Sequence, residues 1–150
     1  IDYGTEGKPR TLEEMIVAGH YYWKSDNITA ERFPITGKGI VKFEARLVHL
    51  NYNISSDGAE AQIMALDPTN PWVPGKIEHL LRFGEKFPEE QRWHPIVGLG
   101  SVAEVHDRCH VPFLGEIGSE RGLYLSSRDG DWGAIFRILA VREVSQTSGS

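Results

Sequence analysis

The order of apolar and polar residues predicts helices in the first half of the chain. Thr11 and Glu14 form a capping-box pattern ahead of an apolar run, which predicts a short helix over residues 12–18. Apolar residues then recur on one stripe over residues 56–67 and again over residues 76–86, a spacing typical of amphipathic helices. We therefore expect three helices, with a proline-rich loop between the second and the third.

Residues 40–50 follow a different period, because apolar and polar residues alternate there. Strict alternation predicts a β-strand with one face toward the core. We expect this strand to be half-buried, with an inner face made of Val41, Phe43, Ala45 and Leu47.

Strand patterns dominate the chain after Pro95, with turn-forming residues between them. A turn is predicted at residues 106–108, and four strands are predicted in one sheet region, over residues 98–105, 109–114, 123–127 and 136–142. Because strands follow helices and no repeat or linker divides the chain, we expect a single α+β domain over residues 1–150. Its helices are expected to pack against a twisted antiparallel sheet.

Composition and charge narrow the classes of partner. The chain has 150 residues, of which 40% are hydrophobic and 25% are charged, as in ordinary globular domains. Its formal charge of −5 argues against nucleic acid, because phosphate binders usually present a basic face. No stretch approaches the roughly eighteen apolar residues of a membrane span, and the first ten residues have no apolar signal core. The cellular compartment stays undetermined.

The single cysteine, Cys109, stands in the densest group of potential metal ligands, beside His106 and His110. No second cysteine or paired histidine stands at the spacing of a zinc site, so a hairpin turn with polar tips is favoured and no metal or other cofactor is expected. A nucleophilic cysteine would need a histidine base, and the adjacent His110 points to the opposite face of a strand. We therefore expect Cys109 to be a small buried side chain.

Other chemical signals are weak. The stretch Gly98-x-Gly100-Ser101 lacks the lysine and the helix that a phosphate-binding loop requires. The four tryptophans are too scattered along the chain to predict a stacking platform. No catalytic motif remains, so we expect a protein that is not an enzyme.

The composition of the segment 121–141 is unusual. It contains no Glu, Lys, Gln or Met, although the whole chain has 25 residues of these types and about three or four are expected in a window of this length. Apart from Trp132, every residue in it can be encoded by a codon ending in a pyrimidine. Diversification of a template of Asn codons would leave this composition, and a Gly- and Ser-rich loop between two strands would look similar.

Three patterns carry a resemblance to a known group of proteins. They are FGEKFPEEQRWHPIVGLGS over residues 83–101, VPFLG over residues 111–115, and a closing pattern of Leu123, Leu125, Trp132 and RILAVR over residues 137–142. Together they resemble C-type lectin domains of the formylglycine-generating-enzyme type. The similarity is greatest to the variable proteins of diversity-generating retroelements from archaea, candidate-phylum bacteria and their viruses.

The resemblance implies a C-type lectin-like fold with a diversified C-terminal segment at about 115–142. In that group, adenine-directed mutagenesis rewrites the segment. This chain departs from the pattern at Ile138, where Phe is usual, and after Leu125, where an aromatic residue is missing. One cysteine cannot supply the cysteine-dependent chemistry of the formylglycine-generating relatives, and Asp129 and Asp131 are too few for a lectin-type calcium site.

Roles follow from the resemblance position by position. The constant framework of the family corresponds to Arg121, Leu123, Leu125, Trp132, Arg137, Leu139 and Val141. The variable, ligand-binding positions correspond to Tyr124, Ser126, Ser127, Arg128, Gly130, Asp131, Gly133, Ala134 and Ile135. Asp129 belongs to neither set, because the family often keeps an acidic residue there. Small adaptable side chains beside Tyr and Arg are typical of paratopes.

Two functional hypotheses from different classes follow. The favoured one is a non-enzymatic, receptor-like protein that displays a diversified surface to bind a protein or glycan ligand. The alternative is a small lectin-fold enzyme or structural protein of unknown activity, in which the C-terminal segment is an ordinary surface loop. The sequence does not specify the ligand or the oligomeric state.

Overall fold

The architecture is that of a computed structural model, which describes residues 1–5, 7–50 and 52–144. The helices are α1 (Leu12–Ala18), α2 (Ser56–Ala65), α3 (Ile77–Lys86) and α4 (Glu90–Trp93). The strands are β1 (Gly4–Thr5), β2 (Lys8–Pro9), β3 (Trp23–Lys24), β4 (Phe43–Val48), β5 (Val73–Pro74), β6 (Ile96–Val97), β7 (Ala103–Val105), β8 (Arg108–Ile117), β9 (Glu120–Ser127) and β10 (Arg137–Glu143).

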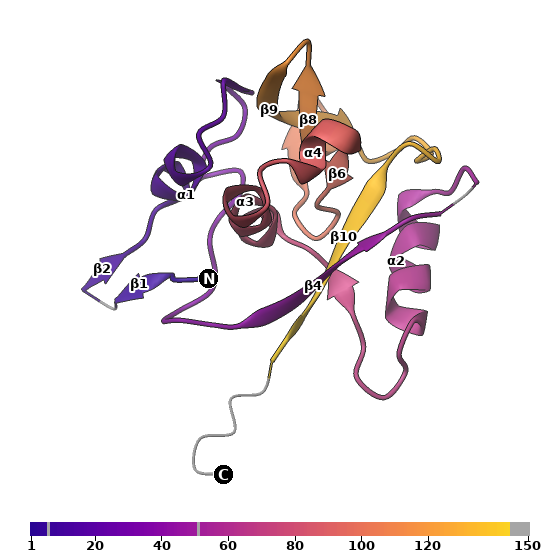
Figure 1. Ribbon diagram of the computed structural model, residues 1–150, viewed down its shortest axis with the longest axis horizontal. Coiled ribbons are helices and arrows are strands. Elements are labelled where there is room, and N and C mark those ends of the chain that lie inside the picture. Colours follow the sequence, from indigo (N-terminus) through magenta and orange to yellow (C-terminus); the bar gives the residue numbers. More distant parts are fainter. Residues whose placement is uncertain (6, 51, 145–150) are drawn as a thin grey trace.

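A twisted sheet runs through the molecule with the strand order β3-β9-β8-β6-β10-β4, and β5 and β7 add to β10 and β8 (Figure 1). Most neighbouring strands are antiparallel, whereas β6–β10 and β3–β9 are parallel. A separate pair is formed by β1 and β2. The predicted α+β class, with few helices against a twisted and mostly antiparallel sheet, is confirmed.

Helices pack against both faces of the sheet. One hydrophobic cluster joins α1 and α3 to Leu123 and Leu139, and a second joins α2 to Ile138 and Ala140. Successive residues of a strand point to opposite faces, so β10 contributes to both clusters. Figure 1 shows the same arrangement, with α1 and α3 on one side of β10 and α2 on the other.

The predicted helix starts are confirmed by their capping contacts. The Thr11 hydroxyl accepts a hydrogen bond from Glu14 N at 3.1 Å, and the Glu14 carboxylate accepts one from Thr11 N at 3.3 Å. At the start of α2, the Ser55 hydroxyl accepts from Gly58 N at 3.1 Å. These bonds satisfy amide groups that have no partner within the first turn of a helix.

The predicted turn between β7 and β8 is also confirmed. Val105 pairs with Arg108, which leaves His106 and Asp107 as a two-residue loop, with φ of 52° and 64°. Two successive residues with positive φ are the geometry of a type I′ hairpin, whose twist matches that of the flanking strands.

The predicted strand over residues 98–105 is wrong for its first half, because the backbone leaves the sheet after β6. Gly100 N donates to Gly75 O at 2.8 Å, and the Ser101 hydroxyl accepts from Ile77 N at 2.7 Å, the first amide of α3. A Cβ at Gly100 would lie 2.5 Å from Pro74 O. This glycine is therefore required by a close backbone approach, and the chain rejoins the sheet only at β7.

The predicted inner face of the strand over residues 40–50 is confirmed for three of its four residues, because Val41, Phe43 and Leu47 are half-buried and pack against the first hydrophobic cluster. Ala45 is exposed and Leu47 is half-buried, whereas the buried residue of β4 is Val48, on the opposite face. Val48 packs in the cluster beneath α2. The same apolar face also borders an open cleft beside α3.

Candidate functional site

The C-terminal segment forms a loop between the ends of β9 and β10, beside the first turn of α2 (Figure 1). The candidate side chains fall into two groups by exposure. Gly130, Asp131, Ala134 and Ile135 are exposed, as is Asp129. The half-buried candidates are Tyr124, Ser126, Ser127, Arg128 and Gly133. The predicted variable positions therefore lie on the last residues of β9 and in the loop that follows, and none of them is buried.

Trp132 lies at the centre of this loop and is the buried exception, with 3% of its surface exposed. Its indole Nε1 donates to the Ser56 hydroxyl at 2.8 Å. Its backbone N donates to Ile54 O at 2.7 Å, and its backbone O accepts from Ile54 N at 3.1 Å. The indole also packs edge-on against Phe136, with ring centroids 5.1 Å apart. These contacts attach the middle of the loop to α2 and to the second hydrophobic cluster.

Arg128 is placed differently from the other candidate residues, because its side chain lies along α2. Its Nη2 contacts Asp57 Oδ1 at 2.8 Å and Glu60 Oε1 at 3.1 Å. The hydrogen bond to Asp57 raises the pKa of the Arg128 guanidinium further. The backbone is held as well, since Arg128 O accepts from the Ser56 hydroxyl at 2.7 Å and Arg128 N donates to Cys109 O at 2.9 Å. Intramolecular ion pairs thus hold this side chain beside the loop.

Tyr124 is part of a row of aromatic rings that crosses the sheet from β3 to the loop. Tyr124 stacks on Trp23 at 5.1 Å and on Phe113 at 5.2 Å between ring centroids. Phe113 meets Phe136 edge-on at 6.4 Å, and Phe136 meets Trp132. Partial burial raises the pKa of the Tyr124 hydroxyl, so this residue is a neutral hydrogen-bonding group at physiological pH.

Sequence reasoning missed this aromatic row, since it treated the tryptophans as scattered. Trp23 and Trp132 are far apart in the chain but stand at the two ends of the row. The parallel pairing of β3 with β9 places Trp23 opposite Gly122, on the face that carries Tyr124. No local pattern predicts a parallel pairing over so few residues. Trp23 is half-exposed, so this end of the row is accessible from solvent.

The group around Cys109 forms a polar hairpin, as predicted, but the prediction of a buried cysteine is wrong. Cys109 is exposed on β8, opposite Glu104. His110 contacts Arg108 O through Nδ1 at 3.0 Å. Within residues 1–5, 7–50 and 52–144, no group of three or more His, Cys, Asp or Glu side chains is arranged to hold a metal ion.

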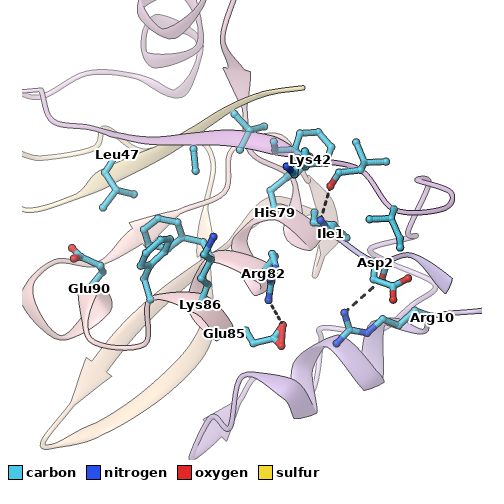
Figure 2. Close-up of a pocket in the computed structure, with 17 residues that line it drawn as sticks. Ile1, Asp2, Arg10, Lys42, Leu47, His79, Arg82, Glu85, Lys86 and Glu90 are labelled. Carbon is cyan, nitrogen blue, oxygen red and sulfur yellow. Dashed lines mark hydrogen bonds and ion pairs between the residues drawn. The ribbon is translucent and has the colours of Figure 1, made fainter. Parts of the chain in front are cut away.

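The cleft between α3 and β4 is shown in Figure 2. It lies on the face of the sheet that carries α3, opposite the face that carries α2. It has a volume of about 810 Å³. Its walls are apolar, and its rim carries charges of both signs, from residues that include Arg10, Lys42, Arg82, Lys86, Asp2, Glu85 and Glu90. Figure 2 shows the Arg82–Glu85 ion pair at this rim, with an N–O distance of 3.1 Å.

His79 lies against one wall of this cleft, edge-on to Phe43, with ring centroids 4.4 Å apart. Its Nδ1 accepts a hydrogen bond from Lys76 N at 2.9 Å, which caps α3. Burial lowers the pKa of His79 to about 4. The imidazole is therefore neutral at physiological pH, and Nδ1 can accept this bond only in the neutral form.

Comparison with known proteins gives no relative, since no family model, curated protein or solved structure matches the chain. Among the described residues, no helix is long and apolar enough to cross a membrane.

Proposed function

We propose that the chain is a non-enzymatic binding protein with a C-type lectin-like fold, a variable protein of a diversity-generating retroelement. In this proposal a display surface recognises a protein or glycan ligand. The display surface comprises Tyr124, Ser126, Ser127, Gly130, Asp131, Gly133, Ala134 and Ile135, with Arg128 at its edge. One observation carries the proposal: a single buried side chain, Trp132, anchors a loop whose neighbouring side chains are exposed.

This arrangement suits recognition because it separates the residues that hold the loop from those that face solvent. Binding residues are frequent on loops that a rigid scaffold positions. Asp131, Ala134 and Ile135 offer a charged, a small and an apolar contact within a short stretch. The half-exposed Trp23 and Tyr124 extend the surface with stacked rings, and such rings supply large contact areas at little entropic cost.

Binding can be tested on a printed array of defined glycans and an array of defined purified proteins. The variant Asp131→Lys, Ile135→Ser changes two exposed residues of the display surface and should remove or redirect the signals of the wild-type chain. Because both side chains are exposed, each change should alter the free energy of unfolding by about 0.5 kcal/mol or less. The melting temperature should therefore stay close to that of the wild type.

The matched control is Glu13→Lys, Val17→Ser, which makes the same kinds of change at two exposed positions on α1. It should keep the wild-type binding pattern. The proposal of a display surface is contradicted if the control loses the array signals while the Asp131→Lys, Ile135→Ser variant keeps them, or if both variants keep them.

The genome that encodes the chain provides an independent test of the retroelement. We expect a reverse transcriptase gene nearby and a near-identical template repeat of the last hundred or so bases of this gene. Gene and template should differ only at adenines of the template, within codons such as those of Tyr124, Ser126 and Asp131. The codons of Arg121 and Trp132 are the internal control and should be identical. Differences at other bases, or in these control codons, would exclude this mechanism.

A further inference from the structure

β4 is the last strand of the sheet, and hydrogen bonding shows which of its backbone groups face outward. Val144 N donates to Lys42 O at 2.9 Å, in the same register as the β10–β4 pair. In an antiparallel pair, hydrogen-bonded and non-hydrogen-bonded positions alternate. Lys42, Glu44 and Arg46 therefore direct their backbone groups toward β10. Val41 shows the opposite direction, since its N donates to Ile1 O at 2.9 Å on the outer side.

The backbone groups of Phe43, Ala45 and Leu47 consequently point away from the sheet. In the described part of the chain, no backbone hydrogen bond beyond the β10–β4 pair involves these three residues. Ala45, in the middle, is exposed. An edge of this kind is a template for another strand, which natural proteins either block or use.

We propose that β4 pairs antiparallel with β4 of a second copy of this chain, around a two-fold axis at Ala45. In this register, Phe43 lies opposite Leu47 of the second copy, and Ala45 lies opposite itself. All three outward positions become hydrogen-bonded pairs, and two N–H···O bonds per pair give about six across the edge. The small side chain of Ala45 allows the two copies to approach at the axis.

Charge complementarity selects this partner and this register. Glu44 lies opposite Arg46 of the second copy, on the face away from the cleft. Glu44 already contacts Arg142, with Nη2–Oε2 at 2.9 Å, whereas Arg46 forms no ion pair within the described residues. Shifting the strands by two residues in either direction would place Glu44 opposite Glu44, or Arg46 opposite Arg46. Like charges directly opposite each other destabilise a strand pair.

The contact is also limited in length. Ile1 occupies the outer edge at Val41, through bonds between its amine and Val41 O and between Val41 N and Ile1 O. A second strand can therefore pair with residues 43–48 but not continue past Lys42. The same patch meets itself on both copies, which gives a closed two-fold dimer rather than a fibre.

Sedimentation velocity of the full chain at low salt tests this interface. The concentration series extends to the highest concentration at which the chain stays in solution. The wild-type chain should dimerise.

Arg46→Glu and Glu44→Lys each place like charges across the edge, so each variant alone should bind itself at least tenfold more weakly. An equimolar mixture should regain the dimer, because the two acidic side chains of the Arg46→Glu strand then face the two basic side chains of the Glu44→Lys strand. Arg108→Glu, an exposed strand residue elsewhere, is the matched control and should dimerise normally.

A backbone variant separates the interface from folding. Ala45→Pro removes an outward N–H that no described residue accepts, so β4 should still pair with β10 and the melting temperature should change little. The same variant should abolish the dimer. A wild-type chain that stays monomeric throughout the series, or a dimer that persists in both Arg46→Glu and Ala45→Pro, overturns the proposal. Failure of the mixture to recover the dimer overturns the assigned register.

Discussion

Trp132→Ala should lower the free energy of unfolding by about 3–5 kcal/mol, the usual cost of truncating a buried aromatic side chain. The substitution removes an indole that is 3% exposed and packs against Phe136. It also leaves the Ser56 hydroxyl without the donor that it meets at 2.8 Å. Urea unfolding followed by circular dichroism measures the change.

The matched control for this prediction is Trp93→Ala, because Trp93 is 75% exposed. Its removal should change the free energy of unfolding by about 0.5 kcal/mol or less. The pair of variants separates the loss of a buried anchor from the loss of any tryptophan. Equal destabilisation by the two substitutions would contradict the assignment of Trp132 as the anchor of the loop between β9 and β10.

Arg121→Met should also destabilise the fold strongly, by about 2–5 kcal/mol, because a buried cation has several acceptors there. Its guanidinium donates to Gly19 O at 2.6 Å, to Gly84 O at 3.0 Å and to Gln91 Oε1 at 3.2 Å. Methionine fills part of the volume but leaves two buried carbonyls unpaired. Thermal unfolding should show a clear decrease in melting temperature.

The environment of Arg121 gives this prediction a second test. The guanidinium lies over the ring of Tyr21, with its Cζ 4.8 Å from the centroid. Burial raises the pKa of Tyr21 to about 12, so the partner ring is neutral at physiological pH. Arg121→Lys keeps the charge but cannot reproduce the planar fork of donors, and it should also destabilise the fold. Arg108→Met, at an exposed position, should be nearly neutral.

Features that depend on neighbouring residues could be predicted from the sequence. The capping box of Thr11 and Glu14 was predictable because its partners are three residues apart. The hairpin at His106 and Asp107 was predictable because turn chemistry is local. The long strands near the C-terminus were predictable because their apolar residues alternate or cluster. In each case a short window of sequence contained the whole cause.

Features that depend on distant contacts could not be predicted. The partners of Arg128 are 71 and 68 residues away, so its sequence context gave no indication of ion pairs to α2. The apolar alternation of residues 41–47 predicted an inner face, because periodicity identifies a face but not what covers it. In the structure, Val41, Phe43 and Leu47 pack against the first hydrophobic cluster, but the exposed Ala45 lines the cleft. The loop itself was predicted from composition, and its role in binding stays a prediction.

The contacts that fasten the loop between β9 and β10 have a consequence for how the chain can evolve. Several of them use peptide groups: Arg128 N and O, and Trp132 N and O. Every amino acid except proline offers the same N–H and C=O. A residue other than proline that replaces Arg128 therefore loses the ion pairs to Asp57 and Glu60. It keeps the main-chain hydrogen bonds to Cys109 O and from the Ser56 hydroxyl. The main-chain attachment of the loop thus tolerates a change of side chain at position 128, while Trp132 supplies the buried side chain of the loop.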